Sequence, residues 1–172
     1  MIDRRVLLAS ATTLAAFSAF RWLGFGGGAK AAETAKVEKF EIEKTPEAWK
    51  KQLSPAQYNV LREAGTERPF SSPLNKEKRK GTFACAGCDL PLFASETKFE
   101  SGTGWPSFYQ ALPNAILEKQ DTTFMMVRTE TLCRRCGGHL GHVFDDGPKP
   151  TGLRYCMNGL ALSFKAADGS TT

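Results

Sequence analysis

The sequence lacks a long apolar run and a strong excess of either charge. Its most apolar stretch, residues 6–20, is uncharged for only 15 residues, whereas about 20 are needed for a helix that spans a bilayer. Residues 1–31 hold four of the 23 basic and one of the 18 acidic side chains. The remainder therefore carries 19 and 17, a net charge of +2. This balance gives no basic surface for nucleic acid, so we expect no nucleic-acid partner.

The first 31 residues predict an export signal. Arg4 and Arg5 precede the apolar run, and Ala29 and Ala31 supply the small residues of a signal-peptidase site. Adjacent arginines before Val-Leu-Leu-Ala favour the twin-arginine type. We expect cleavage near Ala31 and a periplasmic protein. An ordinary secretory signal is one alternative. An uncleaved membrane anchor is another, and it would be the only contact with a membrane.

Beyond the signal, residues 32–44 predict an extended lead-in, followed by two short helices. Thr45 with Pro46 and Ser54 with Gln57 are typical helix starts, the second a capping box.

After Gly65 the pattern changes to short runs rich in Phe, Val, Leu and Thr, separated by Gly, Pro, Asn and Asp. Such runs are typical of strands joined by turns. The sequence therefore predicts one mainly β, mostly antiparallel domain at 45–165, with helices at its N-terminal end. A flexible tail is expected at 166–172.

Four of the five cysteines form two matched pairs, Cys85-x-x-Cys88 and Cys133-x-x-Cys136. Two such pairs suit one tetrahedral zinc ion, and a closed four-cysteine site is structural. The two pairs have 44 residues between them, so the ion would join two distant hairpins. Two disulfides are one alternative, since an oxidising compartment permits them. A mixed cysteine–histidine site that uses a residue of "CRRCGGHLGH" is another.

The fifth cysteine, Cys156, is left without a partner if the other four bind metal. A free cysteine is most often a small buried apolar residue. Arg154, two residues earlier, would share its strand face and favour the thiolate. Asn158, two residues later, would add a hydrogen-bond donor. These neighbours favour a reactive thiol.

The only two histidines of the chain, His139 and His142, lie in one short stretch. This spacing favours a pair of acid–base groups over two unrelated structural residues. Trp105 lies between a glycine and a proline. It is either a buried aromatic at a turn or an apolar wall for a small substrate group.

The stretches "CAGC", "GTGWPSF", "CRRCGGHLGHVFDDGPKPTG" and "GLRYCMN" together closely resemble the B-type methionine-R-sulfoxide reductases. The resemblance runs from about Thr45 to Phe164. It implies two antiparallel sheets that meet like a tent (a β-tent), with structural zinc on the two cysteine pairs. It also implies reduction of the R epimer of methionine sulfoxide, usually in oxidised proteins. We expect the protein to be a monomer.

The resemblance implies a role for each group near the odd cysteine. Cys156 is the expected nucleophile, which attacks the sulfoxide sulfur and becomes a sulfenic acid. His139 and His142 are expected to bind and protonate the sulfoxide oxygen. Asn158 is expected to support their hydrogen bonds, and Arg154 to activate the thiol.

The substrate methyl group is expected to meet Trp105, with Phe144 in the same wall, while Asp146 supports a histidine or an arginine. Many relatives carry a resolving cysteine where this chain has Thr103. With four cysteines on zinc, we expect the sulfenic acid to be reduced by an external thiol or a thioredoxin-like donor.

Two other functions fit parts of the sequence. A zinc-stapled β-tent could act as a non-catalytic binding module, although such a module has no need of the cysteine, the histidines and the tryptophan together. A CxxC disulfide oxidoreductase would need one pair at a helix start in a βαβ setting, which the pattern does not indicate.

Overall fold

The structure is a computed structural model that describes residues 39–169. The predicted export signal, the lead-in up to residue 38 and the last three residues lie outside the described residues. Within this range no helix is long and apolar enough to cross a membrane. Residues 39–44 belong to neither helix nor strand, and the amide of Ile42 donates to the carbonyl of Arg135.

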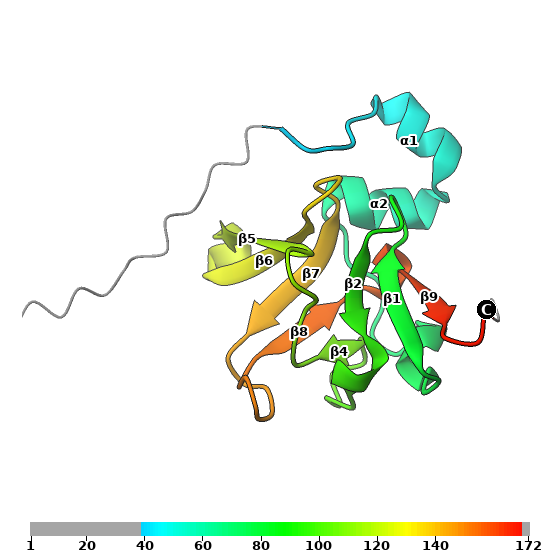
Figure 1. The fold of residues 1–172 in the computed structure, drawn as a ribbon. Helices are drawn as coiled ribbons and strands as arrows, with labels where there is room; N and C mark the ends of the chain where they lie inside the picture. The colour runs from blue at the N-terminus through cyan, green and yellow to red at the C-terminus, as the bar shows by residue number, and fades with distance from the viewer. Residues whose placement is uncertain (1–38, 170–172) are drawn as a thin grey trace, which may run out of the picture. The chain divides into compact units, whose positions relative to one another are not determined.

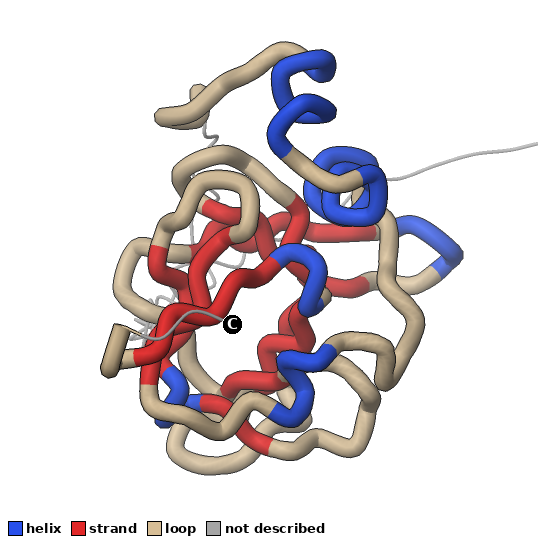
Figure 2. The backbone as a smooth tube through the Cα atoms, turned by 90° about the vertical axis from the view of Figure 1, so that its right-hand side faces the viewer, coloured by secondary structure: helices blue, strands red, loops and turns tan. Residues whose placement is uncertain are grey.

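Two short helices open the domain, α1 (Pro46–Gln52) and α2 (Pro55–Glu63). Both start as predicted. The Thr45 hydroxyl accepts from the Ala48 amide, and Ser54 and Gln57 form the reciprocal capping box. The second helix ends at Glu63 and is capped by Ala64, which adopts a left-handed conformation with φ of 53°. Figure 2 shows that both helices lie at one end of the strands.

The described strands form two antiparallel sheets, as expected for the β-tent class (Figure 1). The three-stranded sheet has the order β2 (Pro91–Ala94), β1 (Gly81–Cys85), β9 (Leu162–Ala166). The six-stranded sheet has the order β3 (Lys98–Phe99), β4 (Ser107–Phe108), β8 (Arg154–Met157), β7 (His139–Phe144), β6 (Arg128–Cys133), β5 (Ile116–Asp121). The described residues also form four 3-10 turns: η1 (Pro73–Lys76) between α2 and β1, and η2 (Ser95–Thr97), η3 (Thr123–Met125) and η4 (Gly159–Ala161) between strands.

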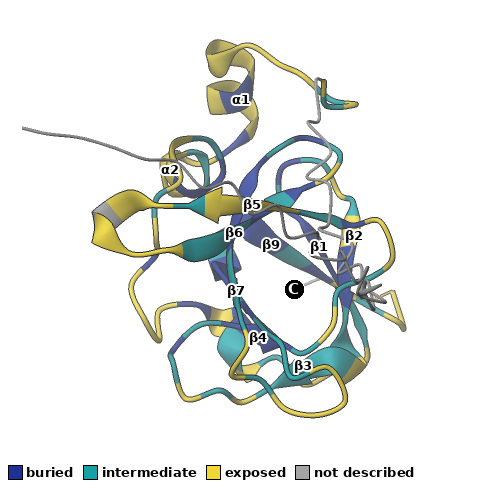
Figure 3. Ribbon diagram, turned by 90° about the vertical axis from the view of Figure 1, so that its left-hand side faces the viewer, coloured by how far each residue is buried: buried dark blue, intermediate teal, exposed yellow. Residues whose placement is uncertain are grey.

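An aromatic core joins the two sheets. Phe93 of the smaller sheet stacks on Phe108 of the larger one, with ring centroids 4.3 Å apart, and also contacts Tyr155. Phe83 meets Phe108 edge-on at 4.9 Å. Phe83, Phe93 and Phe108 are fully buried. Offset and edge-on pairs of this kind add to the stabilisation from burial. Figure 3 shows that the exposed part of the larger sheet is the hairpin between β5 and β6.

The run of residues 153–164, which reads as strand throughout, is divided between the two sheets. It forms β8 in the larger sheet, passes through η4, and continues as β9 in the smaller sheet. Gly159 permits this crossover, because a Cβ there would lie 1.9 Å from the Ser72 hydroxyl oxygen. At the far end β9 includes Ala166, and the amide of Ala167 donates to Lys80. The first two residues of the predicted tail therefore lie at the sheet edge.

Candidate functional site

The four paired cysteines lie together at the ends of two hairpins, one from each sheet. Cys85 ends β1 and Cys88 lies in the turn to β2, while Cys133 ends β6 and Cys136 lies in the turn to β7. All four sulfur atoms lie within 4.8 Å of one another.

The sulfur separations fit a metal site. The Sγ atoms of Cys85 and Cys136 are 3.8 Å apart, and those of Cys88 and Cys133 are 3.5 Å apart. A tetrahedron with metal–sulfur bonds of about 2.3 Å has edges of about 3.8 Å, whereas a disulfide needs about 2.05 Å. The geometry matches a four-thiolate metal site and not two disulfides. Neither histidine belongs to this group of ligands within the described range.

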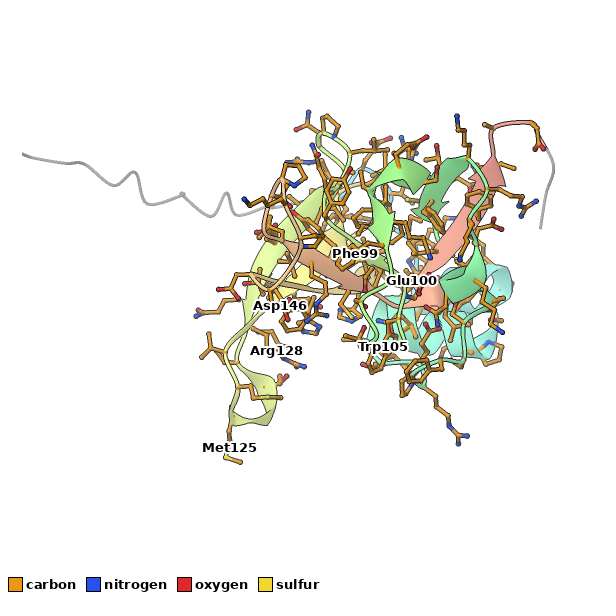
Figure 4. All side chains as sticks on the ribbon, turned by 90° about the horizontal axis from the view of Figure 1, so that it is seen from below. Phe99, Glu100, Trp105, Met125, Arg128 and Asp146 are labelled. Carbon is orange, nitrogen blue, oxygen red and sulfur yellow. The ribbon has the colours of Figure 1, made fainter. Side chains whose placement is uncertain are left out.

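The fifth cysteine lies in a separate pocket of about 170 Å³ on the larger sheet. The pocket is lined by Thr66, Trp105, Arg128, Gly141, His142, Phe144, Cys156 and Asn158. Five of the predicted site residues are therefore brought together: Trp105, His142, Phe144, Cys156 and Asn158. Figure 4 shows Trp105 and Arg128 on different segments that flank this region. The predicted residues His139, Arg154 and Asp146 lie outside the lining.

Cys156 is held in the middle of the larger sheet. Strand β8 lies between β4 and β7, and Cys156 is in register with Ser107 on one side and His142 on the other. The backbone hydrogen bonds to both neighbouring strands thus fix the position of the thiol. Its partner on β7 is one of the two histidines.

Burial raises the pKa of the Cys156 thiol above its ordinary value. The Thr103 hydroxyl and the charge of Arg154 lower this pKa, but they offset the burial only in part. The guanidinium of Arg154 is shared, because it donates two hydrogen bonds of 2.8 Å to Asp146 and stacks 4.4 Å from the Phe144 ring centre. Arg154 lowers the pKa of Cys156, as predicted, but burial raises this pKa by more, so the net shift is upward.

A β-bulge brings the two histidines together. Leu132 of β6 is opposite His139, whereas its neighbour Thr131 is opposite Gly141, so Leu140 is the extra residue. In a regular strand, residues three apart would face opposite sides of the sheet. Here the two imidazole rings have their centres 5.6 Å apart.

Each histidine is oriented by a carboxylate. Nδ1 of His139 lies 2.7 Å from Glu130, and Nε2 of His142 lies 2.8 Å from Asp121. The pKa of Glu130 is lowered, chiefly by its hydrogen bond with His139. Burial lowers the pKa of His142, and the bond to Asp121 opposes this shift. The Nε2 atom of His139 is buried and has no hydrogen-bond partner among the described residues.

Sequence reasoning missed Glu130 and Asp121, which bind the two histidines, and Arg128, which binds Asp121. Arg128 donates to Asp121 at 2.6 Å and lines the pocket. The only signal was two charged residues, Arg128 and Glu130, two apart on one face of the same predicted strand. That pattern is equally typical of a solvated face.

Asn158 lines the pocket, but its side-chain hydrogen bonds go to the backbone and not to a histidine. Its Oδ1 accepts from the Glu67 amide at 3.0 Å, and its Nδ2 donates to the Leu140 carbonyl at 3.2 Å.

Glu67, which sequence reasoning also missed, extends this connection. Its carboxylate accepts from the amides of Gly159 and Leu160, and its carbonyl accepts from the Trp105 indole. Asn158 and Glu67 together hold the pocket wall against the end of β8.

Comparison with known proteins agrees with this arrangement. Residues 53–166 match the sequence model of the SelR domain. The chain is 55% identical over 127 residues to the peptide methionine sulfoxide reductase MsrB of Leptospira interrogans, covering 73% of this chain and 97% of the relative.

It is 56% identical over 131 residues to the protein of the same name from Pseudomonas putida, covering 76% and 98%. The protein of the same name from Methanosarcina barkeri is 56% identical over 128 residues, covering 74% and 90%. The chain therefore belongs to the SelR-domain family, that of the peptide methionine sulfoxide reductases MsrB.

Proposed function

We propose that the pocket reduces the R epimer of methionine sulfoxide in oxidised proteins, with Cys156 as the nucleophile. The observation that carries this proposal is the pocket itself, which brings the odd cysteine beside a histidine and two aromatic side chains. In the reaction the Cys156 sulfur attacks the sulfoxide sulfur, the sulfur–oxygen bond of the sulfoxide breaks, and the oxygen passes to Cys156. The bond between the two sulfur atoms breaks as methionine leaves, so that methionine sulfoxide and a thiol give methionine and a sulfenic acid.

The sulfoxide oxygen must take up protons as its bond to sulfur breaks. His142 lines the pocket, and the unpartnered Nε2 atom of His139 belongs to a ring 5.6 Å away. Carboxylates on the opposite ring nitrogens fix the orientation of both imidazoles, and they stabilise an imidazolium when it forms. We assign proton delivery to this pair.

The substrate methyl group would lie against Trp105 and Phe144, which supply the apolar part of the pocket lining. The Trp105 indole is fixed by its hydrogen bond to Glu67 at 3.2 Å. A rigid wall of this kind selects by shape, since the sulfoxide sulfur must present one face to Cys156 when its methyl group is placed. This is the basis on which we propose preference for one epimer.

The paired cysteines would hold one zinc ion. Four thiolates leave no open coordination position, so the ion would stabilise the fold and take no part in the chemistry. The residues fit such an ion, because their sulfur separations of 3.5 and 3.8 Å match a tetrahedral site.

An external thiol would complete the cycle. The four other cysteines are grouped where they could bind a metal ion. The group that contacts the Cys156 sulfur, at 3.9 Å, is the hydroxyl of Thr103 and not a second thiol. One donor thiol would form a mixed disulfide with Cys156 and release water, and a second would restore the Cys156 thiol. We propose a thioredoxin-like donor, a monomeric enzyme and a periplasmic location, the last resting on the predicted export signal.

The decisive experiment measures reduction of the two epimers of a dabsylated methionine sulfoxide with dithiothreitol. We expect turnover of the R epimer only, and loss of at least about a thousandfold in Cys156→Ser, as for removal of a catalytic nucleophile. Cys133→Ser is unsuitable as a control because it alters the metal site, so Ser163→Ala, half-buried in β9 of the smaller sheet and outside the pocket lining, is the matched control. Activity that survives in Cys156→Ser would refute the assignment.

The same preparation distinguishes the alternative of a non-catalytic binding module. Peptide mass spectrometry after one turnover without reductant should show a sulfenic acid or its trapping adduct at Cys156. A disulfide from Cys156 to another cysteine of the chain would contradict the external donor. Sulfoxide binding without any change of Cys156 would instead support the binding module.

A further inference from the structure

A chain of hydroxyl groups leads from the Cys156 thiol into the interior. The Cys156 sulfur lies 3.9 Å from the Thr103 hydroxyl oxygen, which lies 2.8 Å from the Ser101 hydroxyl. Ser101 in turn lies 2.7 Å from the Ser107 hydroxyl, and Ser107 donates to the Trp105 carbonyl at 3.1 Å. Ser107 is 1% exposed, so the far end of the chain is closed to water.

The direction of each hydrogen follows from the end of the chain. A carbonyl can only accept, so the single hydrogen of Ser107 points to Trp105. Ser101 must then donate to Ser107, and Thr103 must donate to Ser101. The lone pairs of Thr103 are left facing the Cys156 sulfur, so the neutral thiol can donate its own hydrogen to them. Every contact of the chain is satisfied when Cys156 is protonated.

Ionisation of Cys156 reverses the requirement, since a thiolate can only accept. The contact with Thr103 then persists only if the Thr103 hydroxyl turns and donates to sulfur. Either the contact from Thr103 to Ser101 loses its hydrogen, or all three hydroxyls turn and the Trp105 carbonyl loses its donor. One hydrogen bond within the chain is given up for one to the thiolate.

We propose that Thr103 is a positioning residue for the reaction, whose hydroxyl accepts from the neutral Cys156 thiol and turns to donate to the thiolate. Ser101 competes for the Thr103 hydrogen and so opposes this turn. The inference rests on the proposed role of Cys156, and it adds the group that supports the thiolate. It also gives a function to Thr103, which occupies the position of the resolving cysteine of many relatives.

The other polar groups around Cys156 also have partners of their own. Arg154 lowers the pKa of the thiol by its charge and by a side-chain hydrogen bond, but it donates two further hydrogen bonds to Asp146. Arg128 and His142 both bind Asp121. Among the influences that lower the pKa of Cys156, the Thr103 hydrogen bond is larger than the charge of Arg154. The charged and titratable groups facing the thiol from its own and neighbouring strands are Arg154, Asp146, His142 and Arg128.

The test is the rate of Cys156 alkylation by iodoacetamide as a function of pH, with the modified peptide identified by mass spectrometry. Thr103→Val keeps the side-chain shape and removes the hydroxyl. We expect the alkylation midpoint to rise by about one pKa unit and the rate at pH 7 to fall about tenfold, as for loss of one hydrogen bond to a charged group. Thr103→Ser keeps the hydroxyl and should restore the wild-type profile.

Ser101→Ala separates the hydroxyl chain from a single contact. With its competitor removed, Thr103 donates to the thiolate at no cost, so the midpoint should fall below that of the wild type. An unchanged profile in Thr103→Val would overturn the proposal, and so would a raised midpoint in Ser101→Ala. Alkylation requires no sulfoxide, so these results are independent of whether Cys156→Ser abolishes reduction.

Activity supplies a second readout. In Thr103→Val, kcat/KM for the sulfoxide at pH 7 should fall by the same factor as alkylation and recover as the pH is raised. A loss that persists at every pH would indicate a disturbed pocket and count against the proposal.

Discussion

At the scale of single residues, Asn158 is a structural connection as much as a pocket residue. It is 4% exposed, and both ends of its amide are bonded to backbone groups of Glu67 and Leu140. The family resemblance predicted that Asn158 supports the hydrogen bonds of the histidines. The geometry adds that it joins β7 to the segment that carries the pocket wall.

Replacing Asn158 by Ala leaves the buried Glu67 amide without its partner and removes one of the two hydrogen bonds that the Leu140 carbonyl accepts, the other coming from the backbone amide of residue 158. We expect the free energy of unfolding to fall by about 1–3 kcal/mol, the cost of one buried group left unpaired. Urea denaturation measures this loss, with Asn59→Ala on the exposed face of α2 as the matched control. Equal stability of the Asn158 variant and the wild type would mean that the two bonds are unimportant.

The pair of Glu130 and His139 makes stability depend on pH. The folded pKa of Glu130 lies below its ordinary value of 4.5. Its contribution is therefore present above about pH 4.5 and is lost as the pH falls through the folded pKa. Comparing the free energy of unfolding of the wild type and Glu130→Gln between pH 6 and 4, we expect a smaller fall in the variant. The exposed Glu96→Gln should follow the wild type, and an identical slope in Glu130→Gln would contradict the prediction.

Sequence patterns predicted the pocket residues better than their partners. Five of the predicted residues line one pocket. They could be predicted because the three stretches around Trp105, His142 and Cys156 each resemble the family closely. Asp121, Glu130 and Glu67 were missed, since a lone carboxylate in a strand or loop gives no sign that it will be half-buried beside a histidine or a backbone amide. Burial against a distant segment is a property of the fold, and it cannot be predicted from the spacing of residues along the chain.

At the scale of elements, the connection between β5 and β6 is the exposed part of the larger sheet. Met125 is fully exposed and Met126 is 51% exposed, while Val127 leads directly into the pocket residue Arg128. The base of this hairpin is closed by the ion pair between Arg128 and Asp121 at 2.6 Å. Two methionines are therefore exposed at the end of this hairpin.

Dilute hydrogen peroxide should oxidise Met125 and Met126 well before Met157, which is fully buried. The experiment uses Cys156→Ser, which in the proposed mechanism cannot repair itself, and follows each peptide by mass spectrometry. Adding wild-type enzyme with dithiothreitol should then restore roughly half of the sulfoxide, because one epimer is accepted. Equal oxidation of Met157 would show that the core opens on the timescale of the reaction.

Element boundaries were predicted where local chemistry sets them. The two helix starts follow from their caps and prolines, and both were correct. The bulge at Leu140 and the crossover at Gly159 were not foreseen. The first depends on pairing with β6 and the second on close approach of Ser72, and both contacts join segments far apart in the sequence.

At the scale of the molecule, the cysteine cluster ties the two sheets together. Cys85 and Cys88 belong to a hairpin of the smaller sheet, and Cys133 and Cys136 to a hairpin of the larger one. The mainly β class and the grouping of the four cysteines were predicted from the sequence. The division of the strands between two sheets could be predicted only from the family resemblance. The alternation of apolar and polar residues indicates strands, but it does not indicate which strands pair.

Removing the metal ion that we propose for this cluster should loosen both sheets in one transition. We expect a loss on the order of 5 kcal/mol or more in the free energy of unfolding, since metal binding is coupled to folding. Thermal unfolding by circular dichroism, with and without a strong chelator, measures the change. Cys88→Ser should resemble the chelated protein, while Cys156→Ser should retain one zinc per chain and its stability. Unchanged unfolding after complete metal removal would show that the aromatic core alone holds the sheets together.

The four hydrogen bonds of Glu67 have a consequence for the entropy of recognition. Through its amide, carbonyl and carboxylate, this residue joins Trp105, Asn158 and the start of η4 into one unit. The wall is thus ordered before any sulfoxide arrives. In the proposed reaction, the entropic cost of fitting the methyl group falls almost wholly on the substrate, as for any preorganised site. A methionine sulfoxide in a mobile segment of an oxidised protein meets that cost more easily than one held in a rigid core.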